Sequence, residues 1–142
     1  MQNKNSKTSS FYNLISALFA FVLWGGWAYF INSTLAIEVS STGIIAGLTQ
    51  GTASFIITFI IVHLVTYIYN FIHSLTSINT LTFNLVVPAI LTVSITGTGL
   101  YIVHFLMKTP HIAKTIAPAL VVAFLFSLFT VYKLTTSTKN EN

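Results

Sequence analysis

Four long apolar runs alternate with short polar segments along the chain, and the formal charges are confined to the flanks of the runs. The runs are continuous rather than alternating in steps of two, and each can cross a hydrocarbon core of about 30 Å as a helix. Open strands would leave backbone groups unpaired in lipid. The pattern predicts an all-α integral membrane protein, a bundle of four transmembrane helices at residues 12–31, 43–69, 81–107 and 112–132.

Composition supports this class and limits the domain count. The 142 residues are 54% apolar and 6% charged, whereas a soluble domain carries about 25% charged residues. The polar connections are too short for an extramembrane domain, so residues 1–142 are expected to form a single membrane domain. The first apolar run is longer than a signal-peptide core of about 7 to 15 residues, and we expect it to be a retained anchor.

The lysines predict the orientation of the helices. Four of them flank the start of the first helix or the end of the last, namely Lys4, Lys7, Lys133 and Lys139. Only Lys108 and Lys114 lie on the opposite side. Because lysine is enriched on the cytoplasmic side, both termini are predicted to be cytoplasmic. Lysine without arginine, with frequent Ile and Asn, points to an AT-rich bacterial genome and so to a bacterial inner membrane.

Small residues in the second helix form a candidate packing surface. They recur every four residues on one face, at Gly43, Gly47 and Gly51. Small residues let two helix backbones approach closely. This stripe therefore predicts helix packing, either inside the monomer or between copies.

A few polar side chains inside the spans are candidates for a substrate path. They are Gln50 and His63 in the second helix and Ser94 and Thr98 in the third. Ionisable groups inside a membrane are functional candidates by default. The alternative is structural, since hydroxyls can bond to the preceding helical turn and a neutral histidine can bond to a neighbouring group.

The connection between the third and fourth helices gathers four basic or titratable side chains within eleven residues, and we call this set the basic rim: His104, Lys108, His111 and Lys114. Pro110 suits the first position of a new helix, with Thr109 as its N-cap. Lys114 then lies near the positive end of the helix dipole, which disfavours a cation unless an anion binds there. The rim predicts recognition of a phosphate or anionic headgroup; the alternative is that both lysines merely extend to the lipid headgroups.

Several functional classes lack the residues they need. The chain has no Asp or Cys, and its two acids, Glu38 and Glu141, lie outside the spans. Paired carboxylates and an Asp-oriented triad are therefore excluded, and the phosphate-binding loop of ATPases is missing. Four dispersed histidines make no closed metal ligand set, and the positive charge forms no nucleic-acid patch. We expect no enzyme activity, cofactor, metal or nucleic-acid partner.

The remaining functions are those of a small polytopic membrane protein. The leading hypothesis is transport or lipid handling, with an anionic headgroup or phosphate recognised at the extracytoplasmic basic rim. The alternative is a non-catalytic assembly or stabilising subunit of a larger membrane complex. The expected partners are membrane lipids together with further copies of the chain or a larger membrane protein, because small-residue faces favour association.

Overall fold

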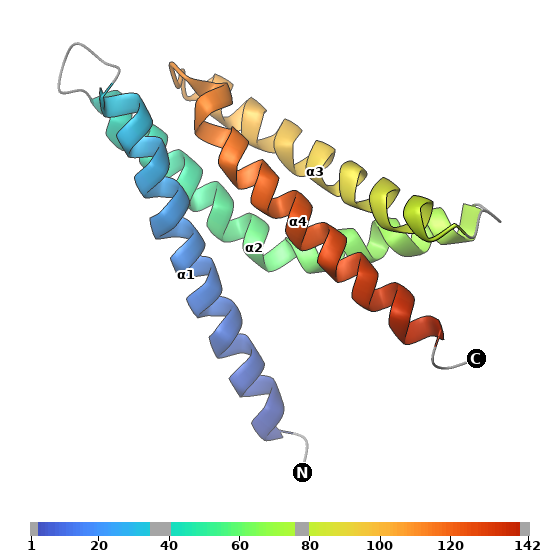
Figure 1. Ribbon diagram of the computed structural model, residues 1–142. Coiled ribbons are helices and arrows are strands. Elements are labelled where there is room, and N and C mark those ends of the chain that lie inside the picture. The colour runs from blue at the N-terminus through green and yellow to red at the C-terminus, as the bar shows by residue number, and fades with distance from the viewer. Residues whose placement is uncertain (1–2, 35–40, 76–79, 140–142) are drawn as a thin grey trace. The chain divides into compact units, whose positions relative to one another are not determined.

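The computed structural model describes residues 3–34, 41–75 and 80–139, which form four helices in chain order (Figure 1). These are α1 (Asn3–Thr34), α2 (Ser41–Leu75), α3 (Leu81–Leu106) and α4 (Ile112–Lys139). Each contains a stretch long and apolar enough to cross a membrane. The predicted class, an α-helical membrane protein with four transmembrane helices, is confirmed. Glu38 and Glu141 lie outside the described residues.

Three of the four helices, α1, α2 and α4, continue beyond the apolar runs that predicted them. α1 begins at Asn3 rather than near residue 12, and α4 ends at Lys139 rather than near residue 132. The apolar pattern identifies only the residues that suit hydrocarbon, whereas a helix satisfies its own backbone bonds in the headgroup region as well. In α4 the hydroxyl of Thr135 donates to the carbonyl oxygen of Val131 at 2.9 Å, so polar side chains also fit the helix.

The described helices group into two compact units. The first unit contains α1, the part of α2 up to Phe59, and the segment from Leu100 to Ile116. The second unit contains α2 from Ile60, α3 up to Gly99, and α4 from Ala117.

In the first unit, α1 lies against α2 along the predicted packing glycines, which are Gly43, Gly47 and Gly51. A Cβ built on Gly43 would collide with Ser33, and one on Gly51 would lie 3.0 Å from Phe21. As residue numbers increase along α2, the contacting residue numbers on α1 decrease. The two helices therefore run antiparallel, side by side in Figure 1. Gly25 of α1 faces them, and a Cβ there would lie 2.9 Å from the carbonyl oxygen of Gly47.

In the second unit, three helices share a small apolar core. It consists of Val65 and Tyr69 of α2 and Val131 of α4, with Leu85 and Leu134 packed against them. Pro88 lies inside α3 without ending it, and the hydroxyl of Thr92 donates to the Pro88 carbonyl oxygen at 2.8 Å.

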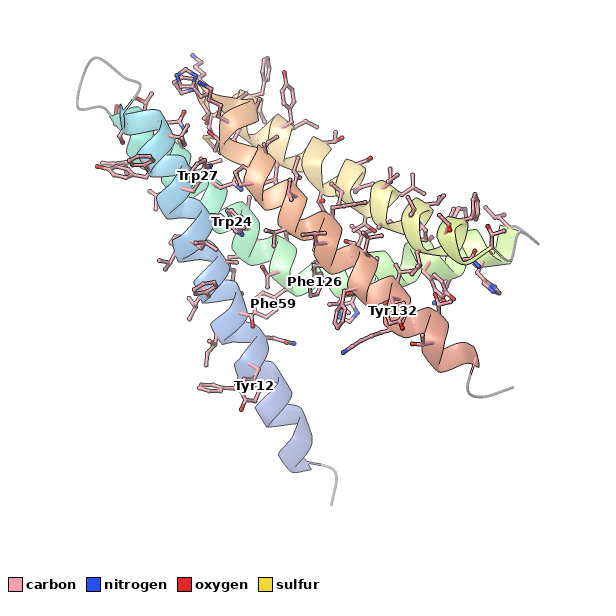
Figure 2. All side chains as sticks on the ribbon, in the orientation of Figure 1. Tyr12, Trp24, Trp27, Phe59, Phe126 and Tyr132 are labelled. Carbon is pink, nitrogen blue, oxygen red and sulfur yellow. The ribbon has the colours of Figure 1, made fainter. Side chains whose placement is uncertain are left out.

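Most large apolar side chains on the helix surfaces remain exposed, as expected for a chain whose surrounding solvent is lipid. Figure 2 shows Tyr12 toward the start of α1 and Trp24 and Trp27 toward its end. Aromatic side chains near both ends of a span are typical of the two membrane interfaces.

Candidate functional site

The turn between α3 and α4 has a defined backbone conformation. Lys108 has a φ of 53°, the only positive φ among the described non-glycine residues. Its N–H donates to the carbonyl oxygen of Phe105 at 3.1 Å, and the N–H of Thr109 donates to that of His104 at 3.0 Å. This pair of bonds is the Schellman arrangement, in which a left-handed residue ends a helix and satisfies its last carbonyl groups.

The imidazole of His104 lies directly beneath this turn and is fully buried. Its Nε2 is 2.6 Å from Oε1 of Gln50 on α2, and its Nδ1 is 2.8 Å from the hydroxyl oxygen of Thr109. An amide oxygen only accepts, so Nε2 carries a proton and donates to Gln50. In the neutral imidazole, the Thr109 hydroxyl then donates to Nδ1. Both ring nitrogens are therefore occupied inside the protein.

The network continues along α2. The amide nitrogen of Gln50, also fully buried, donates to the hydroxyl of Ser54 at 3.3 Å. The hydroxyl of Thr58 donates to the Ser54 carbonyl oxygen at 2.7 Å. These hydrogen bonds form one continuous chain, which we call the buried network and which consists of Thr109, His104, Gln50 and Ser54. It joins α2, the end of α3 and the turn within the first unit.

A second buried amide holds the start of α4. Asn32, near the end of α1, is fully buried, and its Nδ2 donates to the carbonyl oxygen of Ala28 at 2.8 Å and to the Thr115 hydroxyl at 2.9 Å. Its Oδ1 accepts from the backbone N–H of His111 at 3.3 Å. The side chain of Asn32 thereby satisfies a donor at the N-terminus of α4.

A second contact joins α1 to the same turn of α4. The indole N–H of Trp27 donates to the carbonyl oxygen of Lys114 at 3.0 Å. With the buried network and Asn32, this bond ties the α3–α4 turn to both other helices of the first unit.

The predicted N-cap at Thr109 is wrong. α4 begins at Ile112, and the N–H of Thr115 donates to the carbonyl oxygen of His111 at 3.0 Å, so His111 is the residue at the cap position. The Thr109 hydroxyl is instead bonded to His104. A buried imidazole without a partner would be expensive, which explains why this hydroxyl serves the ring rather than the helix end.

The basic rim divides into inner and outer members. Lys108 and Lys114 are exposed, His111 is half-buried, and His104 is buried with both ring nitrogens bonded. The two lysines are the members that can reach a ligand outside the protein. His104 positions the turn that carries them.

The residues of the predicted polar path lie in different surroundings. Gln50 is buried in the first unit, where it bonds to His104 and Ser54. His63, Ser94 and Thr98 belong to the second unit and are exposed. Their placement assigns Gln50 to the buried network and leaves the other three on the helix surfaces.

Sequence reasoning missed Asn32, Thr109 and Thr115 as members of the site. Asn32 and Thr115 are 83 residues apart, and residue spacing cannot identify such a pair. Thr109 lies only five residues from His104, but its hydroxyl was assigned to the helix end instead. The sequence feature that could have identified them is the presence of amide and hydroxyl side chains at the ends of three apolar runs on the same side. Among the residues that the structure describes, no group of three or more His, Cys, Asp or Glu could hold a metal ion.

Comparison of the chain with protein-family models, curated proteins and solved structures finds no match.

Proposed function

We propose that this protein acts in transport or lipid handling and recognises an anionic phosphate headgroup at the α3–α4 turn. Lys108 and Lys114 supply the positive charge. The observation that carries the proposal is that Lys108 in the turn and Lys114 at the start of α4 are both exposed, on a segment held by hydrogen bonds to α1 and α2. Such anchoring keeps the two cations in a fixed relation to the helix ends, as recognition of a headgroup requires.

The backbone at Lys108 supports a role for its charge. Glycine is the usual residue at the left-handed position that ends a helix, and another residue costs about 1 kcal/mol there. Unfavourable conformations of this kind cluster at functional sites. The backbone conformation at position 108 favours glycine. The presence of lysine there is best explained by a ligand that its ammonium group binds.

The position of Lys114 supports an anionic ligand. It lies in the first turn of α4, where the helix dipole is positive and disfavours a cation. The first N–H groups of a helix have no partner within it. A phosphate would accept from such groups and would also neutralise Lys114.

The distribution of lysines supports the orientation that goes with this function. Four lysines flank the helices on the side of the two termini, namely Lys4, Lys7, Lys133 and Lys139. Only two, Lys108 and Lys114, flank the helices on the opposite side. We place both termini in the cytoplasm, the basic rim on the extracytoplasmic side, and the protein in a bacterial inner membrane.

An assembly subunit is the rival function, and the small-residue faces that would dock it include the glycines of α2. In the first unit these glycines are already covered by α1, since a Cβ on Gly47 would lie 3.0 Å from the Gly25 carbonyl oxygen. A partner would have to use another face.

The test compares charge-neutral variants that keep the backbone conformation. The double variant Lys108→Asn with Lys114→Gln removes both charges, and asparagine tolerates the left-handed conformation. Lys133→Gln is the matched control, because Lys133 is also exposed, lies over the Phe129 ring at 4.8 Å and belongs to the other unit. Each protein is purified in mild detergent with equal phosphatidylglycerol and phosphatidylcholine, and retained lipids are counted by native mass spectrometry.

We expect the parent and Lys133→Gln to retain phosphatidylglycerol preferentially. At about 1 kcal/mol for each lysine near an anionic lipid, the double variant should lose about 30-fold in preference and Lys133→Gln no more than about fivefold. An unchanged preference in the double variant would contradict the proposal. So would a stoichiometric protein partner that co-purifies with the parent in the absence of bound lipid.

A further inference from the structure

The second unit carries a regular stripe of exposed side chains along α2. Its members follow one another at intervals of three, four, three and four residues, and we call them the α2 stripe: Ile60, His63, Tyr67, Asn70 and Ser74. All five are exposed. Alternating steps of three and four keep residues on one narrow face, as in the contact seam of paired helices.

The chemistry of the stripe does not suit lipid. His63 has apolar neighbours along the sequence on both sides, from Phe59 to Val65, so it lies within the hydrocarbon-crossing segment. Neither His63 nor Asn70 forms a side-chain hydrogen bond to any residue that the structure describes. Polar side chains inside a span almost always face protein or water. The hydrogen-bond partners of His63 and Asn70 are therefore expected from another molecule, whereas the Ser74 hydroxyl already donates to the Phe71 carbonyl oxygen at 2.8 Å.

We propose that the α2 stripe is the interface with a second copy of this chain. Copies inserted with the same orientation have parallel α2 helices, and a two-fold axis between them brings each stripe residue against its own counterpart. This self-pairing suits the residues present. A neutral imidazole has one donor and one acceptor nitrogen, and an amide has both groups, so His63 and Asn70 can each bond to themselves across the axis.

Charge and register also favour a second copy. α2 has no Lys, Arg, Asp or Glu, so two α2 helices approach without repulsion between like charges. His63 and Asn70 are one heptad apart, and a polar residue at such a seam position fixes the register of a helix pair. The proposal is independent of the basic rim, because the stripe belongs to the second unit and the rim lysines to the first.

The absence of cysteine from the chain gives a clean background for cross-linking. Ile60→Cys places a thiol on the stripe, and Val62→Cys places one on the next exposed face of the same helix. These positions are 47% and 43% exposed, so their accessibility is matched. A disulfide requires Cα atoms about 4.4 to 6.8 Å apart, which a parallel α2 pair gives at position 60 and not at position 62.

The proteins are oxidised in the membrane and their masses are measured. We expect Ile60→Cys to form a product of twice the chain mass, at least about fivefold more than Val62→Cys, given this geometric requirement. Adding His63→Leu or Asn70→Leu to Ile60→Cys should lower the association constant about threefold each, as for one interhelical hydrogen bond. His63→Asn should restore most of the product. His63 and Asn70 are exposed, so these variants keep the fold of the monomer.

Three results would overturn the proposal. One is equal cross-linking at positions 60 and 62, which indicates random collision. Another is no cross-linked product at either position, with a single-chain mass in mild detergent. The third is a product whose mass combines this chain with a different protein, which would assign the stripe to that partner. Loss of lipid preference in the rim variants leaves all three readouts unchanged, so the two proposals fail separately.

Discussion

Gln50 and His104 form a buried hydrogen-bonded pair in the first unit. Replacing either one alone leaves the other without its partner, so the two single losses of stability should together exceed the loss in the double variant. Gln50→Leu keeps the volume of the side chain but takes away the acceptor that His104 Nε2 reaches at 2.6 Å. His104→Leu takes away the donor, and also the partner of Thr109. Both sites are fully buried, so water cannot replace either partner.

The structure sets the magnitude of each loss. An orphaned buried polar group costs about 1 to 3 kcal/mol, and Gln50→Leu orphans one such group, the Nε2–H of His104. Ser54 loses the Gln50 amide as well, but its hydroxyl can bond to the preceding turn. His104→Leu orphans Gln50 and frees Thr109, for about 2 to 4 kcal/mol. The double variant leaves only the Thr109 hydroxyl without its partner, so the sum of the two single losses should exceed the loss in the double variant by at least about 1 kcal/mol.

The assay is the free energy of unfolding in mixed micelles, measured by titration with a denaturing detergent for the parent, both single variants and the double variant. His73→Leu is the control, because His73 is exposed and contacts Tyr69 only through a tilted ring pair at 6.0 Å. We expect little change from it. If the two single losses added to the double within about 0.5 kcal/mol, the bond between Gln50 and His104 would contribute nothing and the reasoning would be refuted.

Two further predictions test how α1 is held in the first unit. Gly25→Ala should destabilise the first unit by about 1 to 3 kcal/mol, because its Cβ would press on the Gly47 carbonyl. Gly26 has open space around it, so Gly26→Ala should be neutral or stabilising by up to about 1 kcal/mol. The same detergent titration distinguishes the two variants. Asn32→Leu should cost about 1 to 3 kcal/mol by orphaning the His111 N–H, and faster hydrogen exchange at the start of α4 would show it, while unchanged exchange would refute the cap.

The membrane class and the approximate helix positions could be predicted from the sequence because lipid imposes one strong requirement. Every backbone group in a span must be satisfied, and long apolar runs can do so only as helices. The same requirement does not set helix ends in the polar flanks, which is why α1 and α4 are longer than their apolar runs.

The candidate site was predictable only as a neighbourhood. Sequence spacing brought His104, Lys108, His111 and Lys114 to one turn, because they are close along the chain. It could not show that His104 bonds to Gln50, 54 residues away, since that depends on how α2 and α3 pack. It also misassigned Thr109, whose hydroxyl had two possible uses, the end of α4 or the imidazole. The hydroxyl bonds to the imidazole because the buried ring has no access to water.

One rule sorts the polar side chains of the spans: each needs a partner, and the location of that partner indicates its role. Gln50 and His104 have partners within the first unit, so they stabilise it. Ser127 is the one buried side-chain oxygen without a partner in the described residues, but a helical serine can turn its hydroxyl to the preceding carbonyl groups, so it implies no ligand. The imidazole of His63 lacks a comparable bond to its own helix. The proposed pairing of two copies supplies that partner, which makes His63 rather than Ser127 the residue whose substitution should change association without changing the fold.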